Sequence, residues 1–282
     1  MTSPDQPTRR PVLAYGATPG RLGILSRAIE TADQAELLAL DLDLRSSWAI
    51  PRVSALTQAS QERSIRLRSV WLPGDISGLV SERRQQSLDA LLVAAKERFG
   101  LRALVVPRHQ GQGDRGAAIH KLARGIASSK SGSQIRLVIG LQASDFRHDR
   151  WHLDQLAGIR RMAEEWDLDL ALDLTGNVSL AWEAEAAILR VFPRLTLVRL
   201  GQWRREDGTL VPNLTGQIAG RTISMLVDQG YSGVVSLVAD RRSSGAALLH
   251  EKQDVLQRFV RDSPGVSPKV DAPISDFTRH DR

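Results

Sequence analysis

Short apolar runs rich in β-branched residues alternate along this chain with longer segments of helical period. Such runs are typical of buried strands, and they begin roughly 26 to 39 residues apart, the length of one strand–helix unit. The runs are Val12–Tyr15, Leu38–Leu44, Arg66–Leu72, Arg102–Val106, Ile135–Leu141, Leu168–Leu172, Leu195–Leu200 and Val234–Val238. Runs such as LRALVV are apolar at nearly every position, as in parallel strands covered on both faces.

Segments with helical hydrophobic spacing lie between the predicted strands. They include Glu82–Phe99, Gly116–Ser128, Leu153–Trp166, Trp182–Val191 and Ala219–Gln229. In the first of them the apolar stripe is Leu88, Leu91, Leu92, Ala95 and Phe99, and Arg83, Arg84, Asp89 and Lys96 lie off it. Gly100 and Gly230 follow two of these segments and are typical helix C-terminal residues.

Eight strand–helix units predict an α/β fold, a single (β/α)8 TIM barrel. A doubly wound open sheet is the main alternative, since it produces the same alternation. The number of strands and the lack of a linker favour one barrel domain over residues 11–261. The polar ends, residues 1–10 and 262–282, are expected to be flexible tails.

Composition restricts the chemistry. The chain has no Cys, which excludes disulfides, thiolate nucleophiles and Cys-ligated metal clusters. No apolar run approaches the roughly 18 residues of a membrane span, and the N-terminus lacks the apolar core of a signal peptide. We therefore expect a cytoplasmic protein without a membrane partner. The net charge of +6 comes mostly from Arg, which suits an anionic partner but is equally explained by overall composition.

Three phrases carry a resemblance to a known superfamily. LVPNLTGQIAGRTISMLVDQGYSGVVSLVAD resembles the closing segment of xylose isomerase-like TIM barrels, which include sugar-phosphate isomerases/epimerases and endonuclease IV. LRALVVPRHQG is similar to that family's fourth strand, with His109 near its histidine, and LALDLTGN to its sixth, with Asp173 at its aspartate. The resemblance implies the barrel fold and an isomerase or epimerase acting on a sugar.

The resemblance also implies a divalent metal held by two Glu, one Asp and one His at the strand C-termini. This chain departs from that pattern at the other positions. Gly140 or Gln142 stands at one Glu position, Arg199 near the His, and Val238 at the last Glu, although a shift of two residues would bring in Asp240. Because Arg199 would repel a cation, we expect no metal and no cofactor.

Cationic and polar residues are expected at the barrel mouth instead. The candidates to bind a small anionic sugar or sugar phosphate are Arg45, Arg108, Gln142, Gln202, Trp203, Ser243, Ser244 and Gly245. The candidate catalytic residues are His109 as general base, Asp173 as its partner or second acid, and Arg199 as oxyanion stabiliser. The alternative interpretation is that the charged residues are solvated or paired with one another or with Asp43, Asp75 and Asp145.

Two other motifs are weaker. GQGDRG, residues 111–116, matches a dinucleotide fingerprint, but it does not directly follow a strand and lacks the later acidic residue. His148 and His152 have the spacing of a helical zinc site, but no third ligand is within reach. We therefore interpret both as loop segments.

Three functions follow from these observations. The favoured one is a sugar phosphate isomerase/epimerase-like barrel that binds a small anionic carbohydrate. Its metal site is degenerate, so that it lacks the family's divalent metal and, if active, works independently of metal. The second is a non-catalytic scaffold or accessory subunit on the same barrel. The third, a nucleic-acid protein like endonuclease IV, is disfavoured by the missing zinc ligands and the few aromatic residues. An oligomer is compatible with each.

Overall fold

The computed structural model describes eight strands and the helices between several of them. The described residues are 11–17, 24–44, 54, 65–72, 82–108, 135–142, 152–175, 181–201, 217–238 and, near the end, 249–250, 252–253 and 255–257. The strands are β1 (Val12–Ala17), β2 (Ala39–Asp43), β3 (Arg66–Trp71), β4 (Ala103–Pro107), β5 (Arg136–Gln142), β6 (Asp169–Asp173), β7 (Leu195–Gly201) and β8 (Val234–Val238).

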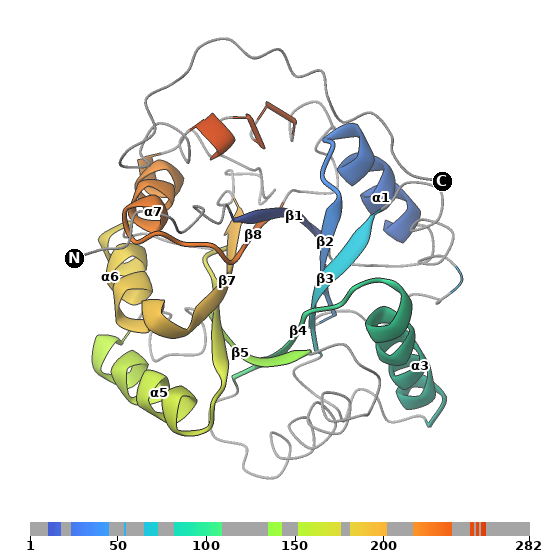
Figure 1. The fold of residues 1–282 in the computed structure, drawn as a ribbon, viewed down its shortest axis with the longest axis horizontal. Coiled ribbons are helices and arrows are strands. Elements are labelled where there is room, and N and C mark those ends of the chain that lie inside the picture. The colour runs from blue at the N-terminus through green and yellow to red at the C-terminus, as the bar shows by residue number, and fades with distance from the viewer. Residues whose placement is uncertain are drawn as a thin grey trace, which may run out of the picture.

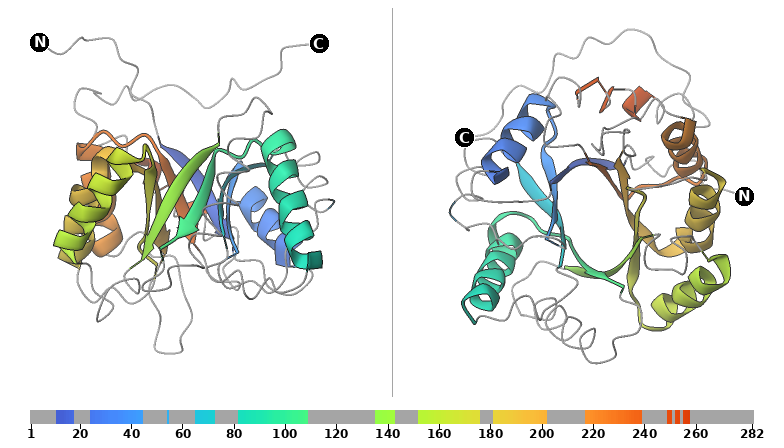
Figure 2. Two further views of the ribbon diagram at one scale, coloured as in Figure 1. Left: turned by 90° about the horizontal axis from the view of Figure 1, so that it is seen from below. Right: turned by 180° about the vertical axis from the view of Figure 1, so that it is seen from behind.

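All neighbouring strands are parallel, and β1 pairs with both β2 and β8, which closes the sheet into a barrel in the order β1 to β8 (Figure 1). The helices lie outside the closed sheet, as the two further views also show (Figure 2). The prediction of a (β/α)8 barrel is therefore confirmed. The open, doubly wound sheet is excluded because such a sheet has two unpaired edges.

The described helices are α1 (Ile24–Gln34), α3 (Glu82–Arg98), α5 (Leu153–Glu165), α6 (Ala181–Val191) and α7 (Gln217–Asp228), with a short 3₁₀ turn, η4 (Phe192–Arg194). Four of them match predicted segments to within two residues at each end. The predicted helix Gly116–Ser128 and both predicted tails lie outside the described residues. Among those residues, no helix is both long and apolar enough to span a membrane.

Helix α3 buries most of the stripe expected from its sequence. Leu91, Leu92, Ala95 and Phe99 are buried between the helix and the sheet. Lys96, which we expected off the stripe, is also buried. It lies four residues after Leu92, so a helix of 3.6 residues per turn places both on one face.

The turns from helix to strand use backbone that favours glycine. Gly100 and Gly230 have φ values of 70° and 67°, which confirms their predicted position just after a helix. Glu36 and Asp167 adopt the same left-handed conformation after α1 and α5, with φ values of 53° and 49°. Because neither residue is a glycine, the sequence did not indicate these two turns.

Strand alternation divides the core into two parts. One face of each strand packs outward against the helices, and the other faces the barrel interior. A separate buried cluster of Trp71, Val105, Val138, Ala171 and Leu197, one residue from each of five consecutive strands, fills part of that interior. Buried polar and charged side chains that also face the interior form the candidate site.

Candidate functional site

The polar part of the barrel interior begins with two aspartates on β2. Leu40 and Leu42 of this strand belong to the outer hydrophobic core, so Asp41 and Asp43, which alternate with them, face inward. Both aspartates are buried. A strand of alternating Leu and Asp that is buried on both faces needs a partner for its carboxylates.

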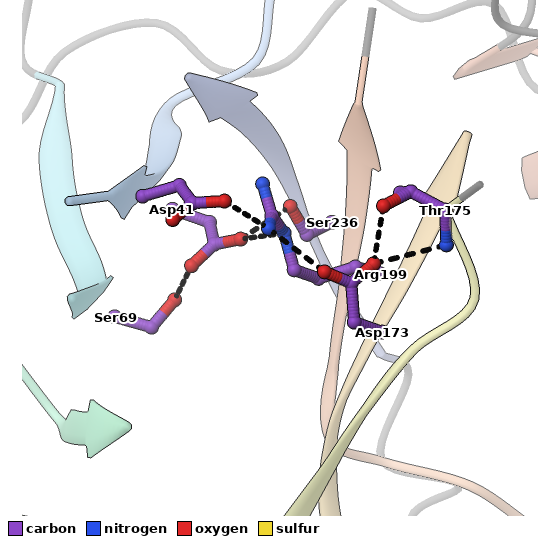
Figure 3. Close-up of polar contacts among 7 residues, drawn as sticks. Asp41, Ser69, Asp173, Thr175, Arg199 and Ser236 are labelled. Atoms are coloured by element: carbon purple, nitrogen blue, oxygen red, sulfur yellow. Dashed lines mark hydrogen bonds and ion pairs between the residues drawn. The ribbon is translucent and has the colours of Figure 1, made fainter. Parts of the chain in front are cut away.

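Arg199 of β7 is that partner. Its side chain is 1% exposed, and its guanidinium lies among three carboxylates. Nε is 2.9 Å from Asp41 Oδ2, and Nη1 is 2.5 Å from Asp43 Oδ2 and 3.3 Å from Asp173 Oδ2. Figure 3 shows Asp41 of β2 and Asp173 of β6 approaching Arg199 from two different strands. We call Arg199, Asp41, Asp43 and Asp173 the arginine–carboxylate cluster.

Asp41 lies deepest in the cluster. Its Oδ1 accepts a hydrogen bond from Ser69 Oγ at 2.5 Å, and its Oδ2 accepts one from Ser236 Oγ at 2.8 Å (Figure 3). Burial raises the pKa of Asp41 above its ordinary value, while Arg199 and the two hydroxyl groups oppose that rise. Asp41 thus carries its charge at a cost that its neighbours partly offset.

Asp173 ends β6 and is held from both sides. Its Oδ1 accepts hydrogen bonds from the backbone N–H of Thr175 at 2.9 Å and from Thr175 Oγ1 at 2.5 Å. Its Oδ2 faces Arg199, the residue paired with Asp173 in the parallel ladder. Both carboxylate oxygens are therefore already engaged by groups of the protein.

The aromatic ring of Trp71 packs against the cluster. The Arg199 Cζ atom lies 5.3 Å from the ring centroid, within the range of a cation–π contact. Gly140 provides room for the ring, because a Cβ at this position would overlap Trp71 and lie 2.7 Å from Val105 Cγ1. The fully buried Trp71, which pairs in register with Asp43, provides an apolar surface beside the charged groups.

The structure brings together some of the residues expected at the mouth. Asp173 and Arg199 are in contact, and Gln142 is paired in register with Asp173. Arg108 directly follows β4, where its backbone N–H donates to the carbonyl of Gly140 at 2.9 Å. The other candidates, Arg45, His109, Gln202, Trp203, Ser243, Ser244 and Gly245, lie outside the described residues, as do Asp240, His148 and residues 111–116.

The surroundings of Arg199 are now visible. The expectation was a cation at the barrel mouth that stabilises an oxyanion, and the structure places Arg199 in a buried position facing three carboxylates, one of them Asp43. The alternative interpretation, pairing with Asp43, describes this arginine better. The cause is the shape of a closed barrel, in which inward side chains from distant strands meet at the axis.

Four further residues of the site were not predicted from the sequence: Asp41, Ser69, Trp71 and Ser236. The available signal was the segment LALDLDL, residues 38–44, in which Asp recurs every second residue inside a buried strand. The register shift between β2 and β3 was not readable, and it is this shift that places Ser69 opposite Asp41.

Among the residues that the structure describes, the arginine–carboxylate cluster does not fit the divalent metal that the resemblance implies. Gly140 and Val238 offer no ligand side chain, Asp173 is fully engaged, and Arg199 places a positive charge among the carboxylates. Within the described ranges, no group of three or more His, Cys, Asp or Glu side chains is arranged to hold a metal ion. The Arg199 guanidinium is the cation that these three carboxylates share.

Comparison of the fold with solved structures yields sugar epimerases, whereas no protein-family model and no curated protein matches the sequence. A 3-keto-D-glucoside 4-epimerase from E. coli has a TM-score of 0.54 at 15% identity, over 88% of this chain and 100% of the other. A D-allulose 3-epimerase from Methylomonas sp., in complex with D-allulose, has a TM-score of 0.54 at 16% identity, over 88% and 98%.

A fusion of a xylose isomerase-like TIM barrel with a 4-hydroxyphenylpyruvate dioxygenase is also similar. Its TM-score is 0.53 at 16% identity, and the match covers 93% of this chain and 46% of the fusion protein. This chain has the xylose isomerase-like TIM barrel fold. In that fold the cluster lies toward the carboxyl ends of the strands, the end at which TIM barrels carry their functional groups.

Proposed function

We propose that this xylose isomerase-like barrel binds a small sugar or sugar phosphate at its carboxyl-terminal mouth, without a divalent metal. The observation that carries the proposal is the arginine–carboxylate cluster: Arg199 lies among Asp41, Asp43 and Asp173. A fixed guanidinium there supplies the positive charge that would otherwise come from a metal ion.

The cluster favours hydroxyl groups over anions at the base of the site. Three carboxylates surround one guanidinium, so the local charge is negative, and carboxylate oxygens accept hydrogen bonds from sugar hydroxyls. A phosphate or carboxylate on the same sugar would lie nearer the rim, where Arg108 follows β4. Arg45 and the segment Ser243–Gly245 are further candidates for the anionic end.

The catalytic form of this proposal is metal-independent isomerisation or epimerisation. His109 would remove a proton next to a carbonyl, and Asp173 would assist it or act as the second acid. Buried Arg199 would act mainly by holding Asp43 and Asp173 in place, and so is a positioning residue in this proposal. The solved neighbours include epimerases of D-allulose and of a 3-keto-D-glucoside, which supports this reaction class.

A non-catalytic sugar-binding scaffold is the second candidate. The observation that favours it is the mutual satisfaction of the cluster, in which Asp173 has both oxygens engaged by Thr175 and Arg199. A carboxylate held in this way is a weak proton acceptor, because the hydrogen bonds stabilise its charged form.

Calorimetric titration of protein treated with EDTA tests the proposal. We expect saturable binding of a ketohexose such as D-allulose, and binding about tenfold tighter for its phosphate ester because of charge-assisted hydrogen bonds. Arg108→Gln should remove the preference for the phosphate and leave the neutral sugar unaffected. Arg161→Gln, on the exposed side of α5, removes the same charge away from the mouth and should change neither.

Transfer of solvent deuterium to carbon, followed by NMR, separates the two candidates. Exchange that persists in EDTA and disappears in His109→Gln supports metal-independent catalysis, whereas binding without exchange supports the scaffold. Absence of binding to every sugar, or binding only after Mn²⁺ or Mg²⁺ is added, would contradict both.

A further inference from the structure

Arginines gather at the opposite end of the barrel, where the strands begin. Arg66 is the first residue of β3, Arg102 immediately precedes β4, and Arg136 is the first residue of β5. The fourth, Arg68, lies two residues into β3, and its carbonyl accepts the backbone N–H of Arg102 at 3.0 Å. These starts of neighbouring parallel strands lie on one end of the molecule, away from the arginine–carboxylate cluster.

Two arginines at this end have acidic partners. Arg136 Nη1 lies 2.8 Å from Asp169 Oδ2, and Asp169 raises the pKa of that guanidinium. Arg194 Nη1 lies 2.8 Å from Asp167 Oδ1. The acids contributed here by the start of β6 and the turn before it are thus already paired.

Arg66, Arg68 and Arg102 are different, and we call them the basic triad. Over the described residues, none of the three forms an ion pair or a side-chain hydrogen bond with another residue. Arg66 and Arg102 are exposed, and Arg68 is half-buried with its Nε atom buried and without a hydrogen-bond partner. Burial, and then the charges of Arg66 and Arg102, lower the pKa of Arg68.

The backbone explains this arrangement. The register between β2 and β3 shifts at Asp41. Leu40 pairs with Leu67 and Asp41 with Ser69, so Arg68 has no partner residue on β2. Gly100, in the turn before β4, leaves space beside the Arg66 stem, whose Cδ lies 3.9 Å from the position of a Cβ at residue 100. The three arginines thus lie on adjoining backbone, and the charges of Arg66 and Arg102 act unfavourably on the Arg68 guanidinium.

We propose that the basic triad is a binding site for a pyrophosphate group, either as free pyrophosphate or as part of a nucleoside diphosphate. A guanidinium is a planar donor that matches phosphate oxygens, and three of them balance the charge of two linked phosphates better than that of one carboxylate. A bound anion would also give the buried Nε of Arg68 an acceptor and relieve the repulsion within the triad.

Titration calorimetry with inorganic pyrophosphate, orthophosphate and ADP tests this site on the full chain. We expect saturable binding of pyrophosphate and ADP, weaker binding of orthophosphate, and a loss of affinity as salt rises. Arg68→Gln should weaken pyrophosphate binding about tenfold or more, and the double variant Arg66→Gln/Arg102→Gln should weaken it further. Arg68→Lys keeps the charge without the planar fork and should give an intermediate loss.

Two further variants separate this site from the rest of the molecule. Arg161→Gln lowers the net charge equally on the outside of α5 and should not change pyrophosphate binding. Arg108→Gln removes an arginine that the proposed function places at the barrel mouth, and it reports whether pyrophosphate binds there instead of at the basic triad. Thermal unfolding without ligand shows that each variant is folded, and the melting temperature of Arg68→Gln should equal or exceed that of the parent protein because repulsion is lost.

Three results would overturn the proposal. The first is no saturable binding of pyrophosphate to the folded parent protein. The second is binding that Arg108→Gln abolishes and Arg68→Gln leaves intact, which would place the anion at the mouth. The third is tight binding of a single-stranded oligonucleotide without binding of pyrophosphate, which would make the basic triad a nucleic-acid surface.

Discussion

Arg199 shows how one residue determines the character of this barrel. It is among the largest fully buried side chains and contacts carboxylates from β2 and β6. A buried guanidinium is tolerated because its neighbours carry the opposite charge, and those neighbours in turn depend on it. Removing Arg199 leaves three buried carboxylates without the cation that faces them.

Arg199→Met should therefore lower the free energy of unfolding by about 3–5 kcal/mol, the usual cost of breaking a buried ion pair from one side. Urea denaturation followed by circular dichroism measures this loss. Arg161→Met on the exposed face of α5 is the control and should change stability by no more than about 0.5 kcal/mol. A loss for Arg199→Met as small as that of the control would show that the cluster is not a mutually stabilising unit.

At the scale of the elements, two glycines have different surroundings: one lies where a larger side chain would not fit, and the other lies in a helix where it would. Gly140 of β5 faces Trp71 and Val105, so a methyl group at this position would overlap a large, fully buried ring. Gly158 lies within α5, and a Cβ there would meet no atom within 4 Å. The same substitution should thus have opposite effects at the two positions.

Gly140→Ala should destabilise the protein by about 1–3 kcal/mol because the core is overpacked. Gly158→Ala should instead stabilise it by about 0.5–1 kcal/mol, since alanine has the higher helix propensity and no contact is disturbed. Chemical denaturation of both variants beside the parent protein provides the comparison. If Gly140→Ala were as stable as the parent, Trp71 would not pack as closely against β5 as described.

The ends of the helices and strands could be predicted from the sequence with different accuracy. The ends of α3 and α7 were predicted because Gly100 and Gly230 follow them, whereas Glu36 and Asp167 make the same turn with ordinary side chains. Strand ends were less certain, and β1 and β7 continue beyond their predicted ends to small residues, Ala17 and Gly201. A small residue carries little hydrophobic signal, although the backbone ladder continues through it.

For the molecule as a whole, Asp41 couples the interior of the barrel to pH. Its raised pKa in the folded state means that the folded protein holds this proton more tightly than the unfolded chain does. The contribution of Asp41 is thus most favourable below its unfolded pKa of about 3.8, and it declines as pH rises through the folded pKa. Arg199, Ser69, Ser236 and Asp43 are the groups that modulate this titration.

Asp41→Asn should flatten the part of the stability profile that falls as pH increases above about 4. Denaturation midpoints at a series of pH values between 4 and 8 measure this, with the parent protein and Asp43→Asn beside the variant. The difference between Asp41→Asn and the parent should grow in favour of the variant at higher pH. If the stability of Asp41→Asn and that of the parent protein changed in parallel with pH, Asp41 would have the same pKa in the folded protein as in the unfolded chain.

The sequence alone was sufficient to predict the barrel. Eight apolar runs at regular spacing allow few arrangements, because each parallel strand must be covered on both faces and the chain must return through a helix each time. It also led to the prediction that Val238, Arg199 and either Gly140 or Gln142 stand at metal-ligand positions of the resemblance, which stays a prediction. Both conclusions depend on residue type and order along the chain, and neither requires distances.

The tertiary structure was needed for the environment of those residues. Asp41 and Arg199 are far apart in the sequence, and closure of the barrel brings β2 and β7 close enough for them to be in contact. The register shift between β2 and β3 places Ser69 opposite Asp41. This shift between β2 and β3 also leaves Arg68 without a partner on β2, close to Arg66 and Arg102 at the amino-terminal end of the strands. Sequence records which charges exist, but whether a charge is balanced depends on neighbours a few ångströms away, and the electrostatic free energy follows that distance and the burial.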